Sequence, residues 1–148
     1  MPRVILGLVL AVSLIACDKS SPTTPTQSTN LTGTWSGSVV VEGATARMVW
    51  TLTQSNGSDV SGPVLFGLSN GTVLLNGFLT GTLSGSVLTY TISVGPGGIP
   101  LSPSCVGQLG GTMTATLGAT STLAGDYNIR SSTCVPPFTG GSLTLTKQ

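Results

Sequence analysis

The sequence predicts an all-β fold, an eight-stranded antiparallel up-and-down β-barrel, with a two-sheet β-sandwich as the alternative. From Leu31 onward, apolar residues alternate with Ser, Thr and Asn at a period of two, which is typical of strands with one buried face. Glycine-containing pairs such as Asn70-Gly71 interrupt the alternation where hairpin turns are expected. After residue 30, no stretch shows the period of an amphipathic helix.

The strands are expected over residues 31–42, 45–54, 59–67, 72–83, 86–94, 107–117, 121–130 and 141–147. Because a slip of one residue would turn a strand over, the turn positions and the alternation must agree. The first five strands are expected to be connected by turns at Gly43-Ala44, Asn56-Gly57-Ser58, Asn70-Gly71 and Ser84-Gly85. They pair Val41 with Ala46, Val39 with Met48, Gly37 with Trp50, Trp35 with Leu52, Trp50 with Val64, Phe66 with Leu75, Leu79 with Tyr90 and Gly77 with Ile92, all on one face.

The opposite face of these strands is mostly hydroxylic, so the sheet has one apolar side and one wet side. Eight such strands can close on themselves, which removes the exposed edges that invite aggregation. Glycines inside the strands suit the bends that closure requires. Five of them fall on the buried face, where we expect them to leave the interior empty of side chains at several levels: Gly33, Gly37, Gly62, Gly77 and Gly125.

A disulfide is expected between Cys105 and Cys134. The loop 118–120 places Ala115 opposite Leu123 and Leu109 opposite Ile129. Extending this ladder sets Cys105 opposite Thr133, one residue from Cys134, a separation that can be bridged if the strand bulges or ends there. The absence of a close Cys-x-x-Cys pair argues against a catalytic redox role.

The N-terminus is typical of an export signal, with Arg3 before an apolar run over 4–15 that is too short to span a membrane. The run ends in Leu14-Ile15-Ala16-Cys17, which resembles the lipobox of bacterial lipoproteins. This resemblance implies cleavage before Cys17 and lipidation of its sulfur; an ordinary signal peptide with an incidental Cys is the alternative. The chain then divides into a signal peptide (1–16), a lipidated Cys with a Ser/Thr/Pro tether (17–30) and a barrel domain (31–148).

Lipidation would place the protein in the bacterial cell envelope, anchored to the inner or outer membrane and facing periplasm or exterior. Without residues 1–16, four basic and four acidic side chains balance, so there is no electrostatic basis for binding nucleic acid. We expect no enzyme, because His is absent and the acids Glu42, Asp59 and Asp126 are scattered. No metal site or cofactor is expected, and the protein is expected to be a monomer.

Gly33-Thr34-Trp35 in the first strand resembles the Gly-x-Trp motif of lipocalins and avidins, the calycin-type barrels. In those families the Trp packs under an Arg of the final strand, whereas here that strand offers Lys147, and Arg130 ends the seventh. The resemblance implies a small molecule held inside the barrel. Simple core packing is the alternative role for Trp35 and Trp50.

Two functions follow as hypotheses. The first is a carrier or receptor for a small apolar ligand, held inside the barrel or under two long apolar loops, 95–106 and 131–140, at the end away from the tether. The second is a structural or surface module with a fully packed core, which binds protein or glycan and uses those loops as a plug. For the carrier, the candidate ligand-binding residues are Trp35, Trp50, Phe66, Tyr90, Leu101 and Phe138.

Overall fold

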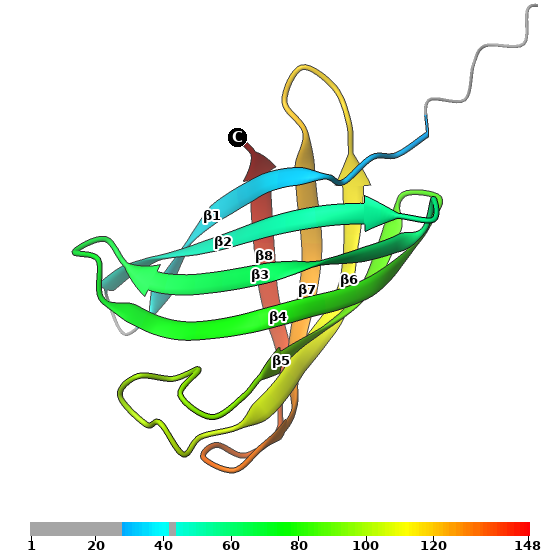
Figure 1. Cartoon of the computed structure of the whole chain (residues 1–148). Coiled ribbons are helices and arrows are strands. Elements are labelled where there is room, and N and C mark those ends of the chain that lie inside the picture. The colour runs from blue at the N-terminus through cyan, green and yellow to red at the C-terminus, as the bar shows by residue number, and fades with distance from the viewer. Residues whose placement is uncertain (1–27, 42–43) are drawn as a thin grey trace, which may run out of the picture.

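The computed structural model describes residues 28–41 and 44–148, which form a closed barrel of eight antiparallel strands (Figure 1). Neighbouring strands follow one another in chain order and β8 returns to β1, so the predicted up-and-down barrel is confirmed and the sandwich is not formed. The predictions for the signal peptide, Cys17 and most of the tether lie outside the described residues. Within the described part of the chain, no helix is long and apolar enough to cross a membrane.

The eight strands lie close to the predicted ranges, with most of their apolar residues turned toward the barrel interior; Leu65, Phe78 and Val87 are exposed exceptions. β7 and β8 extend further into the predicted loop 131–140 than expected, so Phe138 begins a strand. The bounds are β1 Gly33–Val41, β2 Ala44–Ser55, β3 Asp59–Leu68, β4 Val73–Ser84, β5 Val87–Val94, β6 Gly107–Thr116, β7 Thr122–Ser132 and β8 Phe138–Lys147.

Four predicted cross-strand pairs are confirmed: Trp50↔Val64, Phe66↔Leu75, Ala115↔Leu123 and Leu109↔Ile129. The first hairpin differs from the prediction, since β1 and β2 continue to Val41↔Ala44 and bring Trp35 opposite Trp50. The predicted pairs Trp35–Leu52, Gly37–Trp50, Val39–Met48 and Val41–Ala46 are therefore wrong by two residues. A slip of two keeps every side chain on its predicted face, because side chains alternate with a period of two.

The hairpin between β4 and β5 is also displaced by two residues from the prediction, because the turn is Gly85-Ser86 and not Ser84-Gly85. Leu79 lies opposite Ile92, and Gly81 opposite Tyr90, which replaces the predicted pairs Leu79–Tyr90 and Gly77–Ile92. Gly85 has a φ of 60°, the conformation that the first central residue of a type II′ turn requires. Glycine therefore occupies the first turn position, where the prediction had placed serine.

The inward glycines do not leave open space, so that prediction is wrong. A Cβ at Gly37 would overlap the carbonyl oxygen of Thr144, and one at Gly125 would overlap that of Thr112. A Cβ at Gly77 would lie 2.7 Å from Cγ2 of Ile92. These glycines instead allow neighbouring strands to approach closely where the sheet coils into a barrel.

The turns and loops lie at the two ends of the barrel (Figure 1). We call one end the mouth; residues 69–72, 95–106 and 133–137 lie there. We call the other the closed end, where the turns 56–58, 85–86 and 117–121 lie and where the chain enters. All three register shifts of the sheet, at Phe66/Gly67, Gln108/Leu109 and Tyr127/Ile129, fall toward the mouth. Bulges increase local bending and are frequent at barrel rims, so they shape this end.

Side chains fill the closed end. Leu31 is buried, its N–H donates to Oε1 of Gln54 (2.8 Å), and its carbonyl accepts from Nε1 of Trp35 (2.8 Å). Nζ of Lys147, on the final strand, lies 5.4 Å from the centre of the Trp35 ring, which is within the range of a cation–π contact. Side chains therefore close the barrel at the end where residues 28–32 enter.

Candidate functional site

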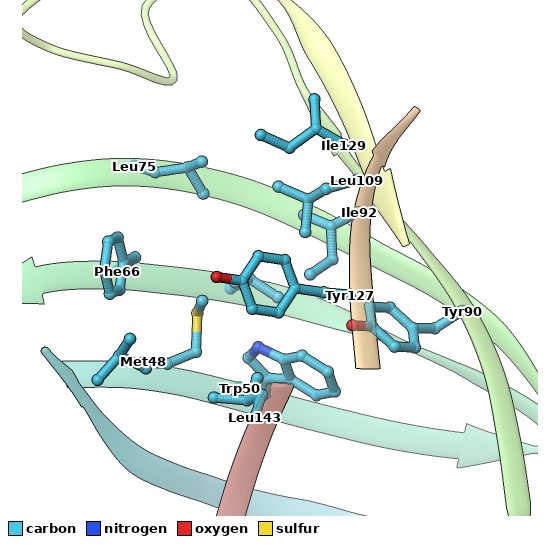
Figure 2. Close-up of a pocket in the computed structure, with 12 residues that line it drawn as sticks. Met48, Trp50, Phe66, Leu75, Tyr90, Ile92, Leu109, Tyr127, Ile129 and Leu143 are labelled. Carbon is cyan, nitrogen blue, oxygen red and sulfur yellow. The ribbon is translucent and has the colours of Figure 1, made fainter. Parts of the chain in front are cut away.

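An apolar cavity of about 170 Å³, here called the inner cavity, occupies the interior on the mouth side of Trp50 (Figure 2). All eight strands contribute to its wall: β2, β3, β5 and β7 contribute two residues each, and β1, β4, β6 and β8 contribute one each. No charged side chain lines it. The wall consists of Val39, Met48, Trp50, Val64, Phe66, Leu75, Tyr90, Ile92, Leu109, Tyr127, Ile129 and Leu143.

Trp50 forms the floor of the inner cavity. It lies opposite Trp35 on one side and Val64 on the other, and it is 0% exposed. The Trp50 and Tyr90 rings are tilted by 59° with centroids 5.0 Å apart, a favourable aromatic geometry. Packing on both sides therefore fixes the indole at the boundary between the filled closed end and the cavity.

The indole nitrogen of Trp50 is the one fully buried side-chain polar atom without a hydrogen-bond partner among the described residues. Figure 2 shows this nitrogen on the edge of the ring that is turned toward Tyr127. Trp35, by contrast, donates its indole N–H to the carbonyl of Leu31. Buried donors are almost always satisfied, so an unpaired N–H on a cavity wall identifies this point as one where a ligand atom could bind.

The two tyrosines of the wall present their hydroxyls differently. The Tyr90 hydroxyl donates to the backbone carbonyl of Asp126 (3.1 Å), and burial, followed by the charge of Asp126, raises its pKa well above the usual range. It therefore stays protonated and engaged with the protein. The Tyr127 hydroxyl points across the inner cavity toward Met48 (Figure 2).

Tyr127 enters the cavity because its cross-strand partner is Gly141. A Cβ at Gly141 would overlap the Tyr127 ring, so only glycine leaves room for the ring in this position. Tyr127 is not among the ligand-binding residues predicted from the sequence. The odd-numbered alternation of β7, with Leu123 and Ile129 facing inward, was the signal that could have identified it.

Asp126, the charged residue that precedes Tyr127 in the sequence, lies on the outer face of β7. Its Oδ1 accepts from the Thr112 hydroxyl (2.8 Å) and backbone N–H (3.3 Å), which lowers the pKa of its carboxyl group. Arg130, also on β7, donates to the Thr91 hydroxyl (3.3 Å). Both charged groups bind partners on the outer face of the barrel, and neither lines the inner cavity.

The Cys105–Cys134 disulfide joins the two mouth loops, with the Cα atoms 5.7 Å apart, and confirms the predicted pair. The pairing was predicted to require a bulge, and the register shift at Gln108/Leu109 is that bulge. It places Gly107 opposite Ser132. The segment 95–106 is further held by its own turns and by a hydrogen bond from the Asn76 N–H to the Gly98 carbonyl (2.6 Å). The loops are therefore fixed in place over the mouth.

A smaller cavity of about 80 Å³ lies beneath these loops. It shares Leu75, Leu109 and Ile129 with the inner cavity and adds Ile99 and Val135 from the loops. The two spaces therefore meet at three common side chains, which separate the interior from the mouth.

The structure brings three of the six predicted ligand-binding residues, Trp50, Phe66 and Tyr90, into the wall of the inner cavity. Trp35 packs in the closed end and does not line it. Leu101 is 75% exposed on the loop, and Phe138 is 48% exposed, with its ring 6.4 Å from that of Tyr127. Five of the six predicted residues are aromatic and the sixth is Leu101, so the aliphatic residues of the wall were not among them.

In the described ranges, no group of three or more His, Cys, Asp or Glu side chains could hold a metal ion. Comparisons of the chain with models of protein families, with curated proteins and with solved structures found no match. The barrel itself is consistent with a calycin-like fold.

Proposed function

We propose that this protein is a lipid-anchored carrier or receptor of the bacterial envelope that binds a small apolar molecule inside its barrel. The observation that carries the proposal is the inner cavity, a neutral space of about 170 Å³ with a wall fixed by strand packing. A module with a fully packed core would have no such space. The alternative of a structural module therefore has less support.

The volume of the inner cavity limits the size of the ligand. Apolar cavities of about 150 Å³ bind benzene, whereas pockets for drug-sized ligands are typically about 300–1,000 Å³. The inner cavity at about 170 Å³ is in the first class. The proposed ligand is thus a single-ring or similarly compact molecule, and not a sterol or a long acyl chain.

The export signal and the lipobox-like Leu14-Ile15-Ala16-Cys17 support anchoring. Because the chain enters at the closed end, a lipid on Cys17 would leave the mouth directed away from the attachment point. Replacing Cys17 with Ala should release the protein from membranes and abolish its acylation while leaving the barrel folded. A Cys17→Ala protein that still fractionates with membranes as an acylated species would refute this part of the proposal.

Titration with toluene tests the binding proposal. The emission of Trp50 should change saturably, and the Trp50→Phe variant should lose most of that response because Trp35 lies outside the cavity wall. The affinity should be unchanged between low and high salt, because apolar burial is not screened. Absence of saturable binding by fluorescence and by calorimetry would leave the packed structural module as the better explanation.

A further inference from the structure

We infer that the ligand of the inner cavity is a neutral molecule with a hydrogen-bond acceptor, such as a small ketone, aldehyde, ester or ether, and that this acceptor binds Nε1–H of Trp50. This inference rests on the proposed function and specifies its ligand class. It is carried by the position of one unpaired, fully buried donor in a wall without charged side chains.

The donor is fully buried and unpaired. Nε1 of Trp50 has no hydrogen-bond partner among the described residues, although the side chain is 0% exposed. Neighbouring rings hold the indole in place, because Tyr90 packs at 5.0 Å between centroids and Trp35 lies on the adjacent strand. The N–H cannot turn toward another acceptor without disrupting this packing, so its partner must come from within the cavity.

The other buried donors of this region already have partners. The Trp35 indole donates to the Leu31 carbonyl, and the Tyr90 hydroxyl donates to the Asp126 carbonyl. Trp50 is therefore distinguished from its neighbours by the absence of an acceptor. An acceptor on the ligand would pair with this buried N–H and remove the free-energy cost of leaving it without a hydrogen bond. A pure hydrocarbon would leave that cost in place.

The charge of the wall excludes ionised ligands. The twelve residues of the inner cavity include no acidic or basic side chain, and the nearby Asp126 and Arg130 are engaged on the outer face. An anion such as a carboxylate would lose its hydration without gaining a counter-charge, which is costly in an apolar site. The acceptor must therefore belong to a neutral group. The Tyr127 hydroxyl, which points into the same space, is a second polar group available to it.

Two molecules of the same shape test this inference. Acetophenone carries a carbonyl oxygen where α-methylstyrene carries a methylene group, and benzoate supplies a matched anion. We expect acetophenone to bind roughly 5- to 10-fold more tightly than α-methylstyrene, the effect of one net hydrogen bond. Benzoate should show no saturable binding.

The two indole N–H signals in a ¹H–¹⁵N spectrum provide a direct readout, since the chain has only two tryptophans. Acetophenone should move the Trp50 signal downfield relative to α-methylstyrene and leave the Trp35 signal in place. Incorporation of 3-benzothienylalanine at position 50 preserves the ring shape and removes the N–H, so it should abolish the preference for acetophenone. The same analogue at position 35, which keeps the ring beside Trp50 and lies outside the cavity wall, should leave the preference unchanged.

The outcomes separate this inference from the proposed function. If neither neutral probe binds, the carrier proposal itself is wrong. If both bind with equal affinity, or if acetophenone binds more tightly without moving the Trp50 signal, the carrier proposal stands and the assigned role of the Trp50 N–H is overturned.

Discussion

Trp35 and Trp50 lie opposite each other on β1 and β2, yet their indole nitrogens have different surroundings. That of Trp35 is bound by Leu31, and that of Trp50 has no partner among the described residues. One indole therefore helps to close the barrel, and the other is available to a ligand. The alternation predicted that both would face inward, but it could not show which nitrogen is satisfied, because the Leu31 acceptor depends on how the chain folds back over the closed end.

Gly125 tests the role of glycine inside the strands. A Cβ here would lie 2.8 Å from Cα of Met113 and would overlap the Thr112 carbonyl on β6. Gly125→Ala should lower the free energy of unfolding by about 1–3 kcal/mol, the usual cost of overpacking. Gly118→Ala is the control, because nothing lies within 4 Å of its Cβ position, and it should change stability by less than about 0.5 kcal/mol. Urea unfolding followed by fluorescence measures both; equal effects would contradict the close-approach argument.

At the scale of elements, the sequence predicted which face of each strand is buried more reliably than it predicted where the strands pair. Both errors of register, at the β1–β2 and β4–β5 hairpins, are slips of two residues. A slip of two preserves the buried face, so alternation cannot detect it. The position of glycine within the turn decides the register, as Gly85 shows, and this requires the backbone conformation to be known.

The bulge at Gln108/Leu109 explains how the Cys105–Cys134 pairing arises. The confirmed pair Leu109↔Ile129 would, without a bulge, set Cys105 opposite Thr133. The register shift brings Gly107 opposite Ser132, so that continuation of the ladder sets Cys105 opposite Cys134. The sequence therefore predicted the disulfide correctly, subject to an irregularity that only the fold could show.

Removal of this disulfide should destabilise the barrel. The cysteines lie 29 positions apart in the sequence, and on the chain-entropy account closing such a loop contributes about 3.6 kcal/mol. The Cys105→Ser/Cys134→Ser protein should therefore unfold at a markedly lower urea concentration. Reduction of the wild-type protein should give the same midpoint as the double variant. Identical midpoints for the oxidised wild-type and the double variant would show that the disulfide contributes nothing to stability.

At the scale of the whole molecule, the barrel interior has two halves with different packing. The closed end is filled by Leu31, Trp35 and the side chains around them, whereas the mouth half contains the inner cavity. Both halves arise from the same alternation of apolar residues. A packed core and a ligand-binding barrel are therefore both compatible with the sequence, because cavity volume depends on all side-chain positions across the eight strands.

Two valines on β3 test this division. Val60 and Val64 both face inward and are 1% and 2% exposed, but only Val64 lines the inner cavity. Val64→Leu should place a methylene in the cavity and raise the free energy of unfolding by up to about 0.8 kcal/mol. Val60→Leu should lower it by about 1–3 kcal/mol, because the closed end has no space for the added group.

The same pair links stability to binding. Val64→Leu should weaken toluene binding because the added methylene occupies part of the 170 Å³ cavity in which the ligand would bind. Val60→Leu should leave the affinity unchanged as long as the protein is folded. Urea unfolding without ligand and calorimetric titration with toluene measure the two effects. A gain in stability with a loss of affinity, at Val64 alone, is expected where a protein keeps a space unfilled for function. Destabilisation by both substitutions would indicate that the mouth half is packed as tightly as the closed end, and the carrier proposal would lose its main support.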